Sequence, residues 1–303
     1  MDVLESKLDT TVNFVEHSSD GGLFESRYVR REDAYLTCYL SSHSGCVKSC
    51  RFCHLTATAQ RTFSHATINQ LKTQADAVLG HYRKVGLPTA KIVYFSFMAR
   101  GEPLANHDLL VKGDFTLREL GVLGSSYGLA SRFCISTIMP AEVRNQELTD
   151  IFEYMRPVFY YSLYSMDKDF RAKWMPQAMD PTKALTKLAR WQNDTGMMVK
   201  IHGAIIPGEN DSLDCWEKNL DAIRNSGLRP EFNLVRYNPH DIPVGDLNLS
   251  LPERSLDAIA RSEDENWTLE NIQYQIFDAG YKVQLKERVG FDVKASCGMF
   301  VNG

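Results

Sequence analysis

An alternation of strand-like and helix-like segments is the feature that most narrows the possible folds of this chain. Apolar runs of six to nine residues predict strands at Tyr35–Leu40, Lys91–Phe97, Arg132–Thr137, Val158–Tyr164, Met198–Ile206 and Glu231–Tyr237. The segments between them predict helices at Thr67–Val85, His107–Leu120, Ala141–Tyr154, Pro181–Asn193 and Ser212–Asn225. Strands that alternate with helices form a parallel sheet covered by those helices. Six such units are fewer than the eight of a closed barrel, so we predict an α/β fold built as a partial (β/α)6 TIM-like barrel.

The two ends of the chain differ from this alternating region. Residues 1–33 read as a short, polar and weakly patterned N-terminal extension. Residues 34–286 hold the strand–helix repeats and close with a further predicted strand at Tyr281–Lys286. Residues 287–303 form a polar C-terminal tail. We therefore predict one barrel domain with a short extension at each end.

Composition places the chain among ordinary globular proteins. Of its 303 residues, 44% are hydrophobic and 24% are charged, which is typical of soluble domains. No run approaches the ~18 apolar positions that a membrane span requires, and Met1–Thr10 is charged, unlike a signal peptide. These features predict a cytoplasmic protein without a membrane partner, and nothing in them demands more than a monomer. A net charge of −4 excludes a uniformly basic surface for nucleic acid but leaves a local basic face open.

Three cysteines lie within eight residues, shortly after the first predicted strand. Cys46, Cys50 and Cys53 have the spacing CxxxCxxC, and a tight loop can bring three such thiols to one metal centre. A structural zinc site normally has four protein ligands. Three thiolates on a cubane iron–sulfur cluster instead leave one iron open to bind and reduce a substrate. Because an odd total of seven cysteines also argues against a secreted disulfide framework, the motif predicts metal or redox chemistry.

Polar residues follow the predicted strands at the end where a β/α barrel binds its ligands. Gly101 and Glu102 form a turn after the second strand, where backbone and carboxylate can approach a ligand closely. Hydroxyl and amide groups end three later strands, at Ser136, Ser162 and Asn238. Each could equally be an ordinary polar turn residue, and only their shared position favours a ligand site.

A further cysteine, Cys297, lies in the polar tail, which is more typical of a reactive thiol than of a core residue. Cys38 lies near the end of the first predicted strand, and we expect it to face the same cavity as Cys297. Cys134 and Cys215 lie within a predicted strand and a predicted helix, where cysteines are most simply buried hydrophobic residues.

Several short segments between residues 24 and 300 are similar, in order and spacing, to one enzyme family. They are Phe24–Val29, Ser41–Cys46, Gly101–Leu104 with Asn106, Ile135–Thr137, Ser162–Tyr164, Met175-Pro176, Asn210-Asp211, Tyr237–Pro239 and the tail through Cys297-Gly298. The CxxxCxxC loop resembles that of the radical S-adenosylmethionine (SAM) superfamily. The tail cysteine, taken together with Cys38 and Glu25, resembles the RlmN/Cfr-type RNA adenine methyltransferases.

This resemblance implies a partial barrel of the radical SAM type that carries a [4Fe-4S] cluster and SAM. The cluster would be ligated by Cys46, Cys50 and Cys53. The SAM site would be lined by Gly101, Glu102, Ser136, Ser162, Leu163, Tyr164 and Asn238. Cys297 would accept a methyl group from one SAM, and a radical from a second SAM would convert that methyl into a methylene radical that adds to C2 or C8 of adenine. Cys38 would release the product by forming a disulfide with Cys297, and Glu25 would handle a proton.

The sequence departs from the family at several points. Tyr164 replaces a histidine, Arg100 stands in a normally glycine-rich approach to Gly101, and the spacing from Cys38 to Cys46 is one residue longer. We also expect residues 1–33 to lack most of the family's N-terminal accessory domain. The implied substrate is RNA, either rRNA or tRNA, or a free nucleotide. The implied electron donor is of the flavodoxin or ferredoxin type.

Two other interpretations stay open. The chain could be a radical SAM enzyme that starts a different radical reaction on a nucleotide or small molecule, without methyl transfer. It could also be a zinc- or cluster-stabilised nucleic-acid-binding module without catalysis.

Overall fold

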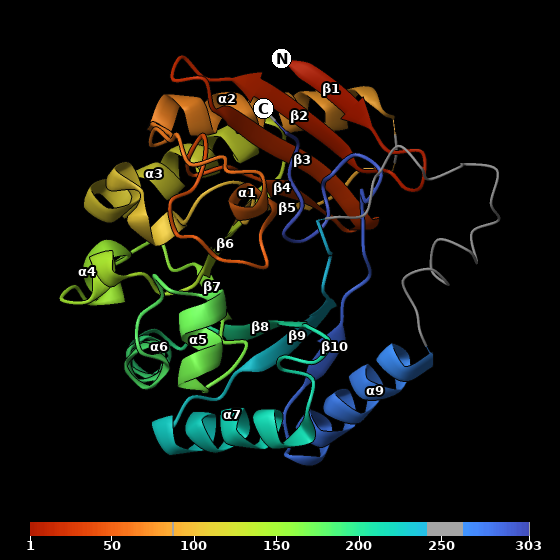
Figure 1. Ribbon diagram of the computed structural model, residues 1–303. Coiled ribbons are helices and arrows are strands. Elements are labelled where there is room, and N and C mark those ends of the chain that lie inside the picture. Colours follow the sequence, from red (N-terminus) through yellow and green to blue (C-terminus); the bar gives the residue numbers. More distant parts are fainter. Residues whose placement is uncertain (87, 241–262, 303) are drawn as a thin grey trace.

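The fold is organised around one continuous sheet. The computed structural model describes residues 1–86, 88–240 and 263–302, and in these residues ten strands lie side by side in the order of the sequence (Figure 1). They are β1 (Asp2–Glu5), β2 (Val12–His17), β3 (Leu23–Glu32), β4 (Tyr35–Tyr39), β5 (Ile92–Phe97), β6 (Ala130–Thr137), β7 (Val158–Ser162), β8 (Val199–Ile205), β9 (Glu231–Arg236) and β10 (Val283–Leu285). Strands β4 to β10 are parallel to their neighbours, and β1 to β4 pair antiparallel. The predicted α/β fold with a partial barrel is confirmed.

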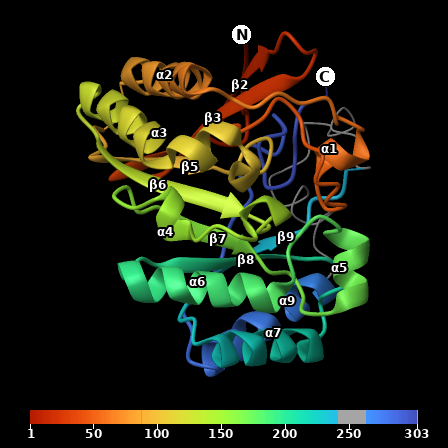
Figure 2. The same cartoon turned by 90° about the vertical axis from the view of Figure 1, so that its left-hand side faces the viewer.

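Helices cover the outer side of this sheet, as Figures 1 and 2 show. The long ones are α2 (Ile68–Lys84), α3 (His107–Ser126), α6 (Pro181–Thr195), α7 (Leu213–Ser226) and α9 (Glu263–Asp278). Short turns of helix are α1 (His54–Ala57), η1 (Pro103–Ala105), η2 (Ala141–Val143), α4 (Leu148–Ile151) and α5 (Lys168–Trp174). The helix predicted over Ala141–Tyr154 is wrong, because η2 and α4 replace it, and α5 was not predicted at all.

The N-terminal segment is more ordered than the sequence predicts. Residues 1–33 contain β1, β2 and β3, which extend the barrel sheet by three antiparallel strands. Their outer face is apolar, with Phe14 and Phe24 in the main core. Their inner face carries Asn13, Glu25 and Arg27, all three buried. Because polar residues interrupt the inner face, the segment lacks the apolar runs that revealed the other strands. The division of the chain at residues 33 and 286 stays a prediction.

The buried hydrophobic residues form two clusters. The main cluster lies between the outer face of the sheet and the helices, and it includes the edge-to-face pair Phe159 and Trp191, with ring centroids 5.1 Å apart. A smaller cluster lies beneath the CxxxCxxC loop and contains Cys50, Tyr164 and Met175. Among the helices of the described ranges, none is long and apolar enough to cross a membrane.

Candidate active site

The CxxxCxxC loop lies between β4 and α1, at the carboxyl end of the parallel strands. Gly45 opens it in very close contact with another segment, because a Cβ at this position would lie 2.2 Å from the carbonyl oxygen of Thr62. Ser49 adopts a left-handed conformation with φ of 56°, which is uncommon for a residue with a side chain. The loop closes where the Cys53 N–H donates to the Cys50 carbonyl at 3.1 Å. Tight turns of this kind bring the three thiols of the motif toward one another.

The chemistry of these thiols fits the predicted cluster. Burial raises the pKa of Cys46 to about 11 and that of Cys53 to about 12, and it raises the pKa of Cys50 as well. The neighbouring thiols add to the shifts of Cys50 and Cys53, which places the three sulfurs within electrostatic range of each other. A positively charged metal centre would stabilise three such thiolates. Among the described residues, no group of three metal-ligating side chains is arranged to hold a metal ion.

The Gly101–Glu102 turn faces the same loop. Gly101 has a φ of +93°, and a Cβ there would lie 2.4 Å from His43 Nδ1 and 2.6 Å from Ser42 Oγ. The turn therefore requires glycine. Glu102 caps η1 by accepting from the Leu104 N–H, and its other oxygen accepts from the Ile138 N–H, each at 3.0 Å. Burial raises the pKa of Glu102 to about 7, so this carboxylate is poised to receive a cationic partner.

The remaining residues predicted for the SAM site follow β6, β7 and β9. Ser136 and Ser162 lie in the last residues of β6 and β7, with Ser162 buried and Ser136 half-buried. Leu163 is fully buried in the main core. Tyr164 has a positive φ of 56° and stacks on Phe52 of the CxxxCxxC loop, with ring centroids 4.5 Å apart. The structure thus brings Tyr164 to the cysteine loop. Binding of SAM by these residues stays a prediction.

The tail returns over this end of the barrel and places Cys297 beside the loop. The Asn238 side-chain amide donates to the Cys297 carbonyl oxygen at 2.7 Å, while the Asn238 Oδ1 is buried without a partner among the described residues. The Cys297 thiol contacts the same small cluster as Phe52 and Cys53. Burial raises the pKa of Cys297 to about 11, so the resting group is a thiol. These contacts place a nucleophilic sulfur next to the predicted metal centre.

His202 is a neighbour of Cys297 that the sequence did not reveal. It lies on β8, and its Nε2 is 3.4 Å from the Cys297 sulfur. Its Nδ1 is buried without a partner among the described residues, and burial lowers the pKa of His202 to about 4. A neutral imidazole therefore faces the thiol. The one available signal was a polar residue in the middle of an apolar strand.

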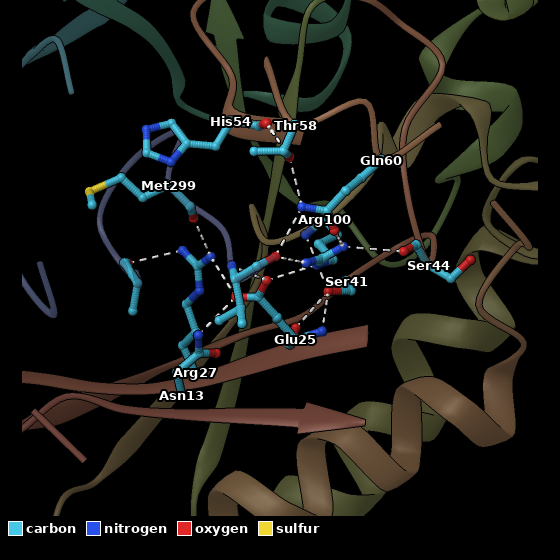
Figure 3. A network of polar contacts seen from close by, with 12 residues as sticks. Asn13, Glu25, Arg27, Ser41, Ser44, His54, Thr58, Gln60, Arg100 and Met299 are labelled. Carbon is cyan, nitrogen blue, oxygen red and sulfur yellow. Dashed lines mark hydrogen bonds and ion pairs between the residues drawn. The ribbon is translucent and has the colours of Figure 1, made fainter. Parts of the chain in front are cut away.

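A buried network of charged groups fixes the tail from below (Figure 3). The Glu25 carboxylate accepts from Arg27 at 3.1 Å and Arg100 at 2.7 Å, and also from the Asn13 side chain and the Val301 N–H. Arg27 donates to the carbonyl oxygens of Ala295 at 2.9 Å and Met299 at 2.7 Å. Arg100 also donates to the Val301 carbonyl oxygen. The structure thus joins β2, β3 and the Gly101–Glu102 turn to the backbone on both sides of Cys297.

This network bears on the predicted role of Glu25. Both of its oxygens already accept from two donors each, and its side chain is fully buried between two guanidinium groups. A carboxylate held in this way anchors the tail, and its role as a proton carrier stays a prediction. Arg27 and Arg100 were not predicted as site residues, because their partners lie up to 272 positions away in the sequence.

The expectation that Cys38 faces the same cavity as Cys297 is wrong. Cys38 pairs with Tyr28 of β3 and Phe95 of β5, and all three side chains lie in the main core on the outer face of the sheet. Its neighbour Tyr39 instead lines the cavity together with Cys297. Adjacent residues of a strand point to opposite faces, so a spacing to Cys46 that is one residue longer moves the cysteine from one face to the other. Cys38 and Cys297 are both free thiols, and the implied disulfide between them is not present.

Comparisons with known proteins fit this geometry. No protein-family model matches the sequence. The fold is similar to the crystal structure of a radical SAM methyltransferase from Sphaerobacter thermophilus, with a TM-score of 0.75 and 18% identity over 99% of this chain and 80% of that chain. The chain therefore shares the fold of that protein.

Curated relatives narrow the class. The chain is 24% identical to the probable dual-specificity RNA methyltransferase RlmN of Lachnospira eligens, over 99% of this chain and 77% of the relative. It is 28% identical to the protein of the same description in Flavobacterium johnsoniae, over 100% of this chain and 79% of the relative. The chain is thus similar in sequence to RlmN-type RNA methyltransferases and similar in fold to a radical SAM methyltransferase.

Proposed function

We propose that this chain transfers a methyl group from SAM to an sp² carbon of adenine, C2 or C8, in RNA, through a methylated Cys297. The observation that carries the proposal is the position of Cys297, which the returning tail holds against the CxxxCxxC loop with its thiol among Phe52 and Cys53. The similar proteins described as RNA methyltransferases support RNA as the substrate. We further infer a cytoplasmic, monomeric enzyme that receives electrons from a flavodoxin- or ferredoxin-type donor.

In this proposal, different residues of the chain bind the cofactors and orient the reacting groups. Cys46, Cys50 and Cys53 would hold the [4Fe-4S] cluster. Together with SAM, that cluster supplies a carbon radical, which can add to an electron-poor adenine carbon where an electrophilic methyl group cannot. Glu102 would pair with the ammonium group of SAM. Burial raises the pKa of this carboxyl group, so a cationic partner would stabilise its charged form.

The other residues of the predicted SAM site would complete this pocket. They are Gly101, Ser136, Ser162, Leu163, Tyr164 and Asn238. Gly101 leaves room for the close turn that carries Glu102, and the unpartnered Asn238 oxygen offers an acceptor. Tyr164 would fix the cysteine loop by stacking on Phe52.

Cys297 would be the acceptor of the first methyl group, because a sulfur nucleophile displaces the methyl of a sulfonium readily. Its proton must leave, and the neutral His202 imidazole, whose Nε2 lies 3.4 Å from the sulfur, is placed to accept it. The network of Glu25, Arg27 and Arg100 would hold the tail in register during both steps. Cys38 has no part in this proposal, since it lies on the opposite face of β4.

The decisive experiment is anaerobic incubation with SAM, a reductant and total RNA, followed by mass spectrometry of the nucleosides. The wild-type protein should produce C-methylated adenosine, and Cys297→Ala should produce none while keeping the iron–sulfur absorbance. Cys215→Ala is the matched control, because Cys215 lies on α7 and its thiol contacts Ser165 instead of the tail. Full methylation by Cys297→Ala would show that the methyl group does not pass through this thiol.

A second candidate function is favoured by the position of Cys38 on the outer face of the sheet, away from the cavity. An RlmN-type site with one thiol in the cavity could start a radical reaction on a nucleotide or small molecule without methyl transfer. Intact-protein mass spectrometry separates the two functions, because only the first leaves one methyl group on Cys297 of protein purified with its cluster.

A further inference from the structure

The interior of the partial barrel holds a cavity of about 340 Å³ beneath Cys297. Six cationic side chains line it but only two carboxylates, Glu32 and Glu287, in a chain whose net charge is −4. A cleft lined by one sign of charge between walls of low polarity concentrates ions of the opposite sign. Even though Arg27 among them is paired with the buried Glu25, the cations of the lining outnumber its carboxylates, whereas the protein as a whole is negative.

Three of these cations gather at one end of the cavity. Lys200 lies on β8, Lys286 directly follows β10, and Arg31 lies on β3. Burial lowers the pKa of Lys286, and the nearby charges of Lys200 and Arg31 lower it further. Of the carboxylates that face the group, Glu231 lies 3.4 Å from Lys200 but also pairs with the surface residue Lys282 at 3.5 Å.

The distance from this basic end to the reactive thiol suits one nucleotide. Lys200 and His202 point to the same face of β8, two residues apart, which is about 7 Å along a strand. His202 contacts the Cys297 sulfur. A base presented to Cys297 would thus leave its sugar and phosphate within reach of Lys200, further toward the amino end of the strands.

Tyrosine rings form the walls next to these cations. Tyr35 and Tyr94 pack edge to face with centroids 5.3 Å apart, and Lys200 lies 5.6 Å from the centroid of Tyr160. All three tyrosines line the cavity. Aromatic walls combined with cations are the usual means of holding a single nucleotide without reading its sequence.

We propose that Arg31, Lys200 and Lys286 form a phosphate-binding subsite for the nucleotide whose adenine is presented to Cys297. This inference rests on the proposed function and deepens it. It predicts that the substrate enters the barrel as one unstacked nucleotide, since a base within a helix could not bring its phosphate into a cavity of this size. The phosphate belongs either to an RNA strand or to a free nucleotide.

The test compares ligands that differ only in phosphate. Anaerobically purified protein that retains its cluster is titrated calorimetrically with adenosine 5′-monophosphate and with adenosine. The phosphate should tighten binding by about tenfold or more, as expected for hydrogen bonds to a charged group. Lys200→Met and Lys286→Met should each reduce that preference severalfold. Lys218→Met is the matched control, because Lys218 pairs with Asp214 on the outer helix α7.

A second arm identifies the source of the phosphate. A single-stranded oligoribonucleotide with one adenine is titrated at several salt concentrations, and each lysine variant should lower the slope of log K against log salt by about one. If only the oligonucleotide responds, the phosphate is that of RNA; if the mononucleotide responds as well, a free nucleotide fits. Should a variant unfold, competition by inorganic tripolyphosphate against the wild-type protein replaces it.

The proposal is overturned if neither the phosphate preference nor the salt slope depends on Lys200 and Lys286. It is also overturned if tripolyphosphate fails to compete. Failure of the proposed function looks different: phosphate-dependent binding would persist, and nucleoside mass spectrometry would find no methylated adenosine.

Discussion

Removing the Arg27 guanidinium should release the tail that carries Cys297. Arg27 is buried, and it donates to the carbonyl oxygens of Ala295 and Met299, on either side of Cys297. Hydrogen bonds from a charged donor contribute about 1.5–3 kcal/mol each. Because the two bonds share one side chain, we take about 3 kcal/mol for the pair. That free energy corresponds to about a 100-fold rise in the open population of the tail.

The assay is the alkylation rate of Cys297 under anaerobic conditions, followed by peptide mapping so that each cysteine is read separately. When reclosing is fast, the rate follows the open population, so Arg27→Met should raise it about 100-fold. Arg30→Met is the matched control. It removes another largely buried arginine of β3, whose guanidinium donates to carbonyl oxygens of Glu32, Asp33 and Pro88 instead of the tail.

Arg30→Met should lower the free energy of unfolding in urea without changing the alkylation of Cys297 relative to other cysteines. The reasoning is refuted if both variants alkylate Cys297 at the same rate. It is also refuted if Arg27→Met lowers global stability while Cys297 stays as protected as in the wild type.

Three further predictions follow from individual residues. Cys38→Ala should lower the free energy of unfolding in urea by about 1–2 kcal/mol, because it removes a fully buried core atom. The same variant should leave methyl incorporation into Cys297 unchanged. Loss of that incorporation would show that the Cys38 thiol has a role in the reaction. The pKa of His202 falls from 6.5 to about 4 on folding, so its contribution is present above pH 6.5 and lost as the pH falls toward 4. At 1.36 kcal/mol per pH unit this amounts to about 3 kcal/mol, and His202→Asn should flatten the pH dependence of unfolding between pH 7 and 4 by that amount. Gly101→Ala places a Cβ against His43 in a left-handed turn, and it should lower the free energy of unfolding by about 1–3 kcal/mol. Gly121→Ala is the control, because Gly121 lies inside α3 and its Cβ would meet only Phe133, at 3.6 Å. This second variant should leave the stability unchanged or raise it.

The parts of the fold that the sequence predicts well are those where local pattern and burial agree. Parallel strands covered on the outside by helices appear as apolar runs, and the predicted run at Lys91–Phe97 corresponds closely to β5. The helix predicted from Thr67 is α2, which has Thr67 as its N-cap in a capping box with Gln70. By contrast, β2 and β3 bury Asn13, Glu25 and Arg27 on one face. Such strands lack an apolar run, so their partners in the distant tail had to be seen before they could be recognised.

The candidate site shows the same division. The three cysteines of the loop and the Gly101–Glu102 turn could be predicted, because each motif is local. The contact between His202 and Cys297 joins residues 95 positions apart, and no local pattern encodes it. The prediction for Cys38 is wrong for a different reason. The strand was predicted correctly, but the face of the strand on which Cys38 lies was not. A register irregularity between β3 and β4, at Val29 and Glu32, lies in the same strand pair.

The face of β4 on which Cys38 lies is not easily exchanged. Turning the strand over would bring Leu36 and Cys38 into the polar cavity, and it would force Thr37 and Tyr39 into the core against α2. Leu36 and Cys38 are both fully buried, so the flip would expose apolar surface and bury hydroxyl groups without partners, at a cost of several kcal/mol. Motion of the strand therefore does not supply Cys38 to Cys297. If methyl transfer through Cys297 passes through a methylene bridge between sulfur and the base, the nucleophile that breaks the sulfur–carbon bond must come from the cavity face or from solution. On this face His202 contacts the sulfur, and Arg27 and Arg100 hold the tail. We therefore predict that the last step, if it occurs, does not use Cys38, the second thiol that the family resemblance implies.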